Sequence, residues 1–162
     1  MKGNSIAVWA AVLALGATAP AFAATGHSHD SHSQEAHAAP AKLTLDHGRK
    51  WATDEALRRH MGEIRGALSE KRHAIHKGAL DAEGAKQLGA AIEKGVAGIV
   101  ADCKLPPEAD ANLHVVVADL VSAADILQGR TQEKAAHGAT KAVHAVNQYG
   151  KYFDHPGWKR VE

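Results

Sequence analysis

The sequence predicts an all-α protein, in which four helices form an antiparallel up-down-up-down bundle preceded by a disordered histidine-rich arm. Apolar residues recur at three- and four-residue steps in four segments of about twenty residues each, the period of a helix with one buried face. No stretch of useful length alternates apolar and polar residues, so no strand is expected. The segments are joined by short loops, which connect antiparallel neighbours.

Residues 1–23 are expected to be a signal peptide and no part of the fold. Lys2 supplies a positive start, and residues 6–15 form an apolar core that is too short to span a bilayer. Ala21-Phe22-Ala23 then places small residues at a cleavage site, and cleavage after Ala24 is the alternative. We therefore expect export to the periplasm of a Gram-negative cell, with no membrane attachment after cleavage.

Charge is balanced once residues 1–23 are removed. Cleavage removes one cation, Lys2, from nineteen Lys and Arg, and leaves eighteen against eighteen Asp and Glu. Nucleic acids and anionic membranes are bound through a surplus of positive charge, so neither is expected as a partner. The only cysteine is Cys103, so a packed core and no intrachain disulfide must stabilise the domain.

Residues 24–42 consist largely of Ala, His, Ser, Gly and Pro, with few apolar side chains to bury. Such a segment cannot offset the entropy lost on ordering, so we predict a disordered arm. The bundle domain then covers residues 43–162. It is expected to begin with an extended piece at residues 43–45 and a turn at Asp46-His47-Gly48.

The first helix is predicted to follow an N-cap at Thr53 and to end at Gly78, and the second to follow an N-cap at Asp81 and to end before Pro106. Their buried faces are expected to be Leu57, Met61, Ile64, Leu68 and Ile75, and Leu88, Ile92, Val96, Ile99 and Cys103. Frequent glycines are expected to let neighbouring backbones pack closely at Gly62, Gly66, Gly84, Gly89, Gly95 and Gly98.

Pro107 suits the first turn of the third helix, which is expected to stop at Gly129, and Thr131 is predicted to cap the fourth. The inward positions are expected to be Leu113, Val116, Val117, Leu120, Ala124 and Leu127, then Ala136, Ala139, Val143, Val146, Gly150 and Phe153. Late aromatic residues are expected to plug the pole where the fourth helix leaves the bundle: Tyr149, Tyr152, Phe153 and Trp158, with Trp51.

Three motifs carry a family resemblance. LDHGRKW at residues 45–51, CKLPPEAD at 103–110 and YGKYFDHPGW at 149–158 resemble a family of uncharacterised exported helical-bundle proteins of proteobacteria. The resemblance covers residues 43–160 and excludes the arm. It implies export and a helical bundle, and it brings no activity with it.

The chain is also similar, more loosely, to cytochrome b562, a periplasmic four-helix bundle that holds haem between its first and last helices. The resemblance implies a methionine ligand early in the first helix, which Met61 matches. At the place of the histidine ligand late in the fourth helix stands Gly150, which cannot bind iron, so His144 would have to substitute. Haem is therefore the less favoured cofactor.

The arm carries the clearest candidate for a metal site. Its histidines follow the spacing His-x-His-x2-His-x4-His at His27, His29, His32 and His37, with Asp30 and Glu35 between them. Imidazole suits Cu(II), Zn(II) and Ni(II), and several imidazoles on a flexible chain can wrap one ion. Cleavage after Ala24 would make Thr25-Gly26-His27 the new N-terminus. A free amino group with a histidine in the third position is a second motif that binds copper or nickel. The alternative is a polar linker.

A second candidate site lies in the bundle. The first and third helices begin, and the second and fourth end, at the same pole of an up-down-up-down bundle. This arrangement places His60, Cys103 and His114 toward one pole, where Cys with His suits copper or zinc. The preferred interpretation is that these histidines are partly exposed and hold no ion, and that Cys103 is buried.

No feature indicates an enzyme. Cys103 lies on an apolar face, and no serine or carboxylate pair has the context of a catalytic group. The sequence therefore predicts an exported, non-enzymatic protein that sequesters or buffers copper, zinc or nickel with its arm. A haem-binding electron carrier and a structural or sensory bundle with an inert tether remain as alternatives.

Overall fold

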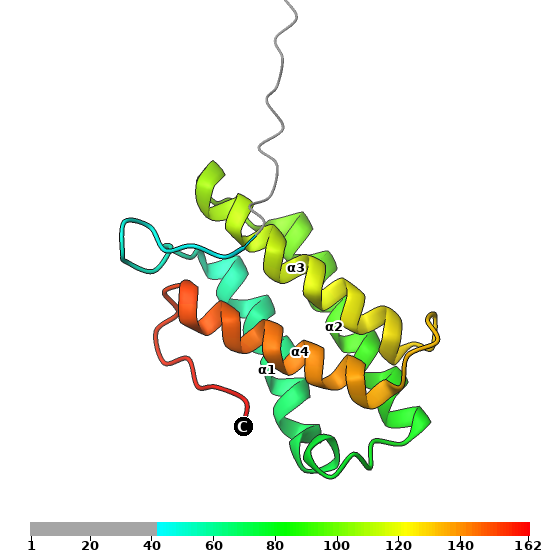
Figure 1. The fold of residues 1–162 in the computed structure, drawn as a ribbon. Helices are drawn as coiled ribbons and strands as arrows, with labels where there is room; N and C mark the ends of the chain where they lie inside the picture. The colour runs from blue at the N-terminus through cyan, green and yellow to red at the C-terminus, as the bar shows by residue number, and fades with distance from the viewer. Residues whose placement is uncertain (1–41) are drawn as a thin grey trace, which may run out of the picture. The chain divides into compact units, whose positions relative to one another are not determined.

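The computed structural model describes residues 42–162, and over this range it confirms the all-α four-helix bundle (Figure 1). Each helix packs against its neighbours in the sequence, and the first and last helices close the ring. The predicted signal peptide and the predicted arm up to residue 41 lie outside the described residues. The helices are α1 Glu55–His76, α2 Ala82–Asp102, α3 Pro107–Leu127 and α4 Ala135–Tyr152.

None of the helices in the described part of the chain is long and apolar enough to cross a membrane.

Local side-chain chemistry sets the helix ends. Asp81 caps α2 as predicted, because its Oδ1 accepts a hydrogen bond from Gly84 N at 2.7 Å. The prediction of Thr53 as the cap of α1 is wrong by one residue. Asp54 caps that helix by accepting from Leu57 N at 2.6 Å, while the Thr53 hydroxyl donates to the Asp154 carbonyl. A carboxylate is the stronger acceptor, and it also complements the helix dipole.

The predicted start of α4 is also wrong. Thr131 lies four residues before the helix, and its hydroxyl accepts from Glu133 N at 3.2 Å in a local turn. The helix begins at Ala135 without a side-chain cap. Ala136, predicted to face inward, is exposed in this first turn. The buried face of α4 starts at Gly138 and Ala139, where α3 covers the helix.

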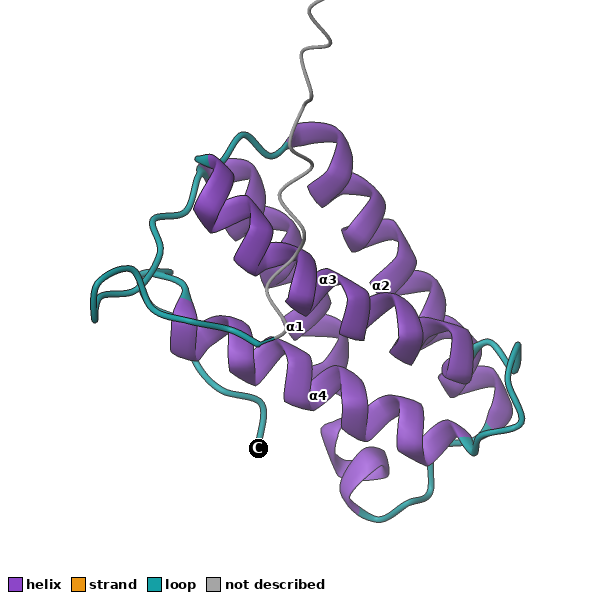
Figure 2. Cartoon of the chain, turned by 45° about the horizontal axis from the view of Figure 1, so that its top comes forward, coloured by secondary structure: helices purple, strands orange, loops and turns teal. Residues whose placement is uncertain are grey.

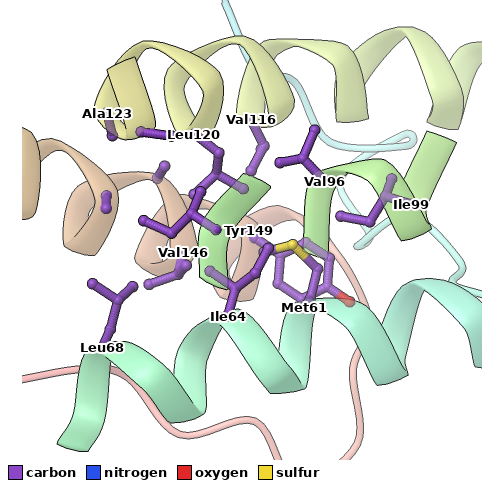
Figure 3. Packing of buried hydrophobic residues seen from close by; sticks show 14 of the residues in the cluster. Met61, Ile64, Leu68, Val96, Ile99, Val116, Leu120, Ala123, Val146 and Tyr149 are labelled. Carbon is purple, nitrogen blue, oxygen red and sulfur yellow. The ribbon is translucent and has the colours of Figure 1, made fainter. Parts of the chain in front are cut away.

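The core lies between all four helices, and most of the predicted inward residues are fully buried in it. Figure 3 shows Met61 and Ile64 of α1 pointing into the space shared with Val96 and Leu120. Five predicted inward residues are only half-buried: Ile75, Cys103, Val117, Val143 and Gly150.

Glycines serve close packing at some predicted positions and not at others. A Cβ on Gly95 would overlap the Ile64 side chain, and one on Gly98 would overlap the His60 ring, so both glycines let α1 approach α2. In contrast, a Cβ on Gly62 or Gly66 would meet nothing within 4 Å. The expectation of close packing is therefore wrong for these two residues.

Two irregular segments lie beside the end of α4 (Figure 2). Residues 43–45 are extended, and Asp46 and Arg49 close the predicted turn with hydrogen bonds in both directions. The segment then reaches α4, where Trp51 N donates to the Tyr152 carbonyl at 2.8 Å. The C-terminal tail turns back beside α4, as Figure 1 also shows, and buries Val161.

The predicted aromatic plug is present at the pole where α4 ends. Tyr149 and Phe153 are fully buried and stack with ring centroids 5.2 Å apart. Trp158 meets the Tyr149 ring edge-on at 4.8 Å and lies over Gly150, where a Cβ would clash with it. The tail is therefore held by an aromatic cluster that seals the end of the core.

Candidate functional site

The arm histidines His27, His29, His32 and His37 lie outside the described residues. The chain that leads to them is anchored at Thr44, whose N–H donates to Asn112 Oδ1 on α3 at 2.9 Å. Trp51 Nε1 donates to the carbonyl of Thr44 at 2.7 Å. Leu43, the preceding residue, packs against the core. The described part of the chain is therefore fixed to the bundle at Thr44, two residues after Lys42.

His60 belongs to the interface of α1 and α2. Its side chain is only 12% exposed, and its Nε2 lies 2.9 Å from Asp102 Oδ2. Because a carboxylate only accepts, Nε2 must carry the hydrogen of this bond. Nδ1 is buried without a hydrogen bond, although Glu63 Oε2 is 3.5 Å away. His60 therefore acts as a connection between two helices.

Asp102 receives a second contact at the same oxygen, from Arg59 Nη2 at 2.8 Å. The hydrogen bond from His60 and the positive charge of Arg59 lower the pKa of Asp102, against a smaller opposing effect of burial. The carboxylate is therefore ionised over a wider pH range than an ordinary aspartate.

Cys103 and His114 meet in a different place, a pocket of about 280 Å³ between α2 and α3 that Asp110 also lines. His114 Nδ1 lies 2.9 Å from the carbonyl oxygen of Asp110, to which it donates. The predicted second site had three residues. The structure brings Cys103 and His114 together in this pocket, but His60 faces Asp102. In the part of the chain that is described, no three His, Cys, Asp or Glu side chains form a metal-binding group.

Cys103 is held as a thiol. It packs against the core at the end of α2, but it is half-buried there and not fully buried as predicted. Burial, followed by the negative charges of Asp54 and Asp102, raises the pKa of the Cys103 thiol to about 11. The thiol is therefore protonated near neutral pH, and it is a poor nucleophile there.

The two residues considered for haem are separated. Met61 is fully buried in the core, where the side chains of the neighbouring helices surround it. His144 is exposed on α4 and lines a hollow to which Met61 does not contribute. The described structure does not place them as a pair on one ligand. Trp158 covers Gly150, the position that corresponds to the histidine ligand of cytochrome b562.

His155 is a structural residue at the pole where α4 ends, and it belongs to the motif YGKYFDHPGW. Its Nδ1 lies 3.0 Å from the Tyr149 hydroxyl, and its ring packs 4.8 Å from that of Trp158. Burial, followed by the charges of Arg58 and Arg65, lowers the pKa of His155. Burial raises the pKa of Tyr149, so the phenol keeps its proton and donates a hydrogen bond to Nδ1 of the neutral imidazole.

One surface feature was missed altogether, a hollow of about 800 Å³ on α4 lined by Lys50, Lys151 and Arg160. The three cations come from the N-terminal segment, from α4 and from the tail. Lys50 is far from the other two in the sequence, and the place of Arg160 depends on the fold of the tail, so only the structure could reveal that they line one hollow.

Comparisons with protein-family models, with curated proteins and with solved structures found no match to this chain.

Proposed function

We propose that the protein is an exported, non-enzymatic metal-binding protein that sequesters or buffers Cu(II), Zn(II) or Ni(II) with the histidines of its arm. The observation that carries this proposal is the spacing of His27, His29, His32 and His37. Four of the chain's twelve histidines fall within residues 27–37. Serine, glycine or glutamine would serve a polar linker equally well, so the choice of histidine favours a ligand role.

The chemistry follows from the ligand type. Neutral imidazole is a borderline ligand for these three ions, and three or four copies on a flexible chain can share one ion without a folded cage. Asp30 and Glu35 supply oxygen ligands or accept hydrogen bonds from the second ring nitrogen. Such a site binds with moderate affinity and exchanges its ion quickly, which suits buffering more than permanent storage.

The bundle supports the proposal because its two least exposed histidines have other partners. His60 joins two helices through Asp102, and His155 accepts from Tyr149 inside the aromatic plug. His114 and His144 are exposed on different helices. In this account the bundle is the stable body that carries the arm, and periplasmic export brings the arm to metal ions outside the cytoplasm.

Metal analysis together with an absorbance spectrum of untagged protein tests the proposal. We expect bound copper, zinc or nickel, released near pH 6, because protonated imidazole, with its ordinary pKa of about 6.5, cannot bind a metal. A Soret band would instead support the haem carrier. Protein that takes up no divalent ion in equilibrium dialysis would leave the structural or sensory bundle as the better account.

A further inference from the structure

The hollow on α4 concentrates positive charge in a chain whose charges otherwise balance. Its charged or titratable lining residues are Lys50, His144, Lys151 and Arg160, and no Asp or Glu lines it. The ion pairs of the described residues use other cations, among them Arg59, Arg130 and Lys141. The three permanent cations of the hollow therefore face a common space without a carboxylate in its lining.

Each cation is held by the fold. Lys50 Nζ donates to the carbonyl of Gly150 at 2.7 Å, which fixes the N-terminal segment against the end of α4. Lys151 Nζ lies 5.2 Å from the centre of the Tyr152 ring. Both contacts leave donors of the ammonium groups available, since each ammonium carries three.

Arg160 is positioned by its neighbour Val161. Asn147 on α4 donates to the Val161 carbonyl at 2.9 Å and accepts from Val161 N at 3.0 Å. The Val161 side chain is buried, so this pair of hydrogen bonds locks the tail onto the helix. The exposed Arg160 is thereby kept at the hollow although it lies close to the end of the chain.

We propose that this hollow binds a phosphate-bearing ligand. A guanidinium and two ammonium groups in a lining without a carboxylate suit the geometry and the charge of a phosphate, which Arg binds with two hydrogen bonds and Lys as a point charge. A volume of about 800 Å³ admits much more than the phosphate group itself, and Val143 offers an apolar contact for the remainder. The phosphate could belong to a free compound or to a phospholipid headgroup. This proposal does not depend on the function proposed for the arm.

Titration with inorganic pyrophosphate tests the proposal. The full chain is stripped of metal with a chelator and dialysed free of it, and amide NMR signals are followed at low ionic strength. We expect shifts at residues 147–151. The variant Lys151→Gln/Arg160→Gln should weaken binding by at least about tenfold, because it removes charge-assisted hydrogen bonds from two exposed residues.

The matched control is Lys86→Gln/Lys94→Gln, which removes the same charge from exposed positions on α2. It should change affinity less than twofold. Equal weakening in the two variants, or no shifts at residues 147–151 in the wild type, would overturn the proposal. Because the titrated protein is metal-free, neither result depends on the arm binding metal.

Co-sedimentation with phosphatidylcholine vesicles, with and without phosphatidylglycerol, identifies the source of the phosphate. A headgroup ligand predicts binding only to vesicles with phosphatidylglycerol, competition by pyrophosphate, and loss in the double variant of the hollow. A free phosphate compound predicts pyrophosphate binding without vesicle binding. Vesicle binding that persists in the double variant would show that the hollow is not the site of lipid contact.

Discussion

His60 on α1 lies with Nε2 2.9 Å from Oδ2 of Asp102, the last residue of α2. The ring rests against Gly98, one turn earlier on the same helix, where a Cβ would overlap it. A histidine that the sequence suggested as a metal ligand thus fastens two helices together. The hydrogen bond also sets the ionisation of the carboxylate.

Asp102→Asn should lower the melting temperature in a pH-dependent way. Because the folded state lowers the pKa of Asp102, the stability from its ionised form is present above the ordinary aspartate pKa of about 3.9, and it is lost as pH falls through the lower folded value. The difference in melting temperature between variant and wild type should be present at pH 7 and pH 5, and it should become smaller below about pH 4. Glu70→Gln, at an exposed position of α1, is the control. A difference of constant size down to pH 2.5 would contradict the role of the carboxylate.

Gly98 of α2 and Gly62 of α1 predict opposite effects of the same change from Gly to Ala. Gly98→Ala should destabilise by about 1–3 kcal/mol, since the new methyl group must displace the His60 ring. Gly62→Ala, in the helix that faces it, should stabilise by about 0.5–1 kcal/mol, because Ala is the better helix former and its methyl meets nothing within 4 Å. Urea unfolding measures both. The packing account fails if the two substitutions change stability in the same direction.

The four helices could be predicted because they follow from the periodicity of apolar residues. The residue at which a helix starts depends instead on which of several possible N-cap residues takes that role. Thr53 and Asp54 both suit an N-cap, and the carboxylate takes that role while the hydroxyl serves the C-terminal segment. Thr131 has cap chemistry but makes a turn of its own, and α4 begins later without a side-chain cap. Propensity rules do not include such tertiary partners.

For the candidate sites, the bundle topology predicts only which residues lie at the same pole. Topology places the C-terminal end of α2 and the start of α3 at one pole, and Cys103 does share a pocket with His114. It does not give the rotation of each helix, and that rotation turns His60 toward Asp102. The hollow on α4 depends on Arg160, whose place is set by hydrogen bonds of Asn147 to the tail.

His155 should make the protein less stable in mild acid. Its folded pKa is lowered, so the stability from keeping it neutral is present above the ordinary histidine pKa of about 6.5, and it is lost as pH falls through the folded value. His155→Asn keeps an acceptor for the Tyr149 hydroxyl but cannot titrate. Its unfolding free energy should therefore fall less between pH 7 and pH 5 than that of the wild type. His73→Asn, at an exposed position, should keep the wild-type slope, and an equal slope for His155→Asn would refute this role.

Cys103 should react slowly and should not bind metal. With a thiol pKa of about 11, alkylation by iodoacetamide at pH 8 should be far slower in the native protein than in urea, where the ordinary pKa of about 8.5 applies. Cys103→Ala should cost about 1 kcal/mol through a small cavity and leave metal binding unchanged. A visible charge-transfer band with Cu(II) or Co(II) that disappears in Cys103→Ala would move the metal site into the bundle.

The most direct test of the arm's role compares copper and zinc binding by the wild type with that of a variant in which His27, His29, His32 and His37 are all replaced by Ser. Equilibrium dialysis should show that the variant loses most of its bound ion, while its helical circular dichroism and melting temperature stay close to those of the wild type. A control that replaces four exposed histidines of the bundle with Ser should keep the wild-type stoichiometry; these are His47, His73, His76 and His144. The account predicts loss in the first variant alone, and full stoichiometry in the arm variant would contradict it.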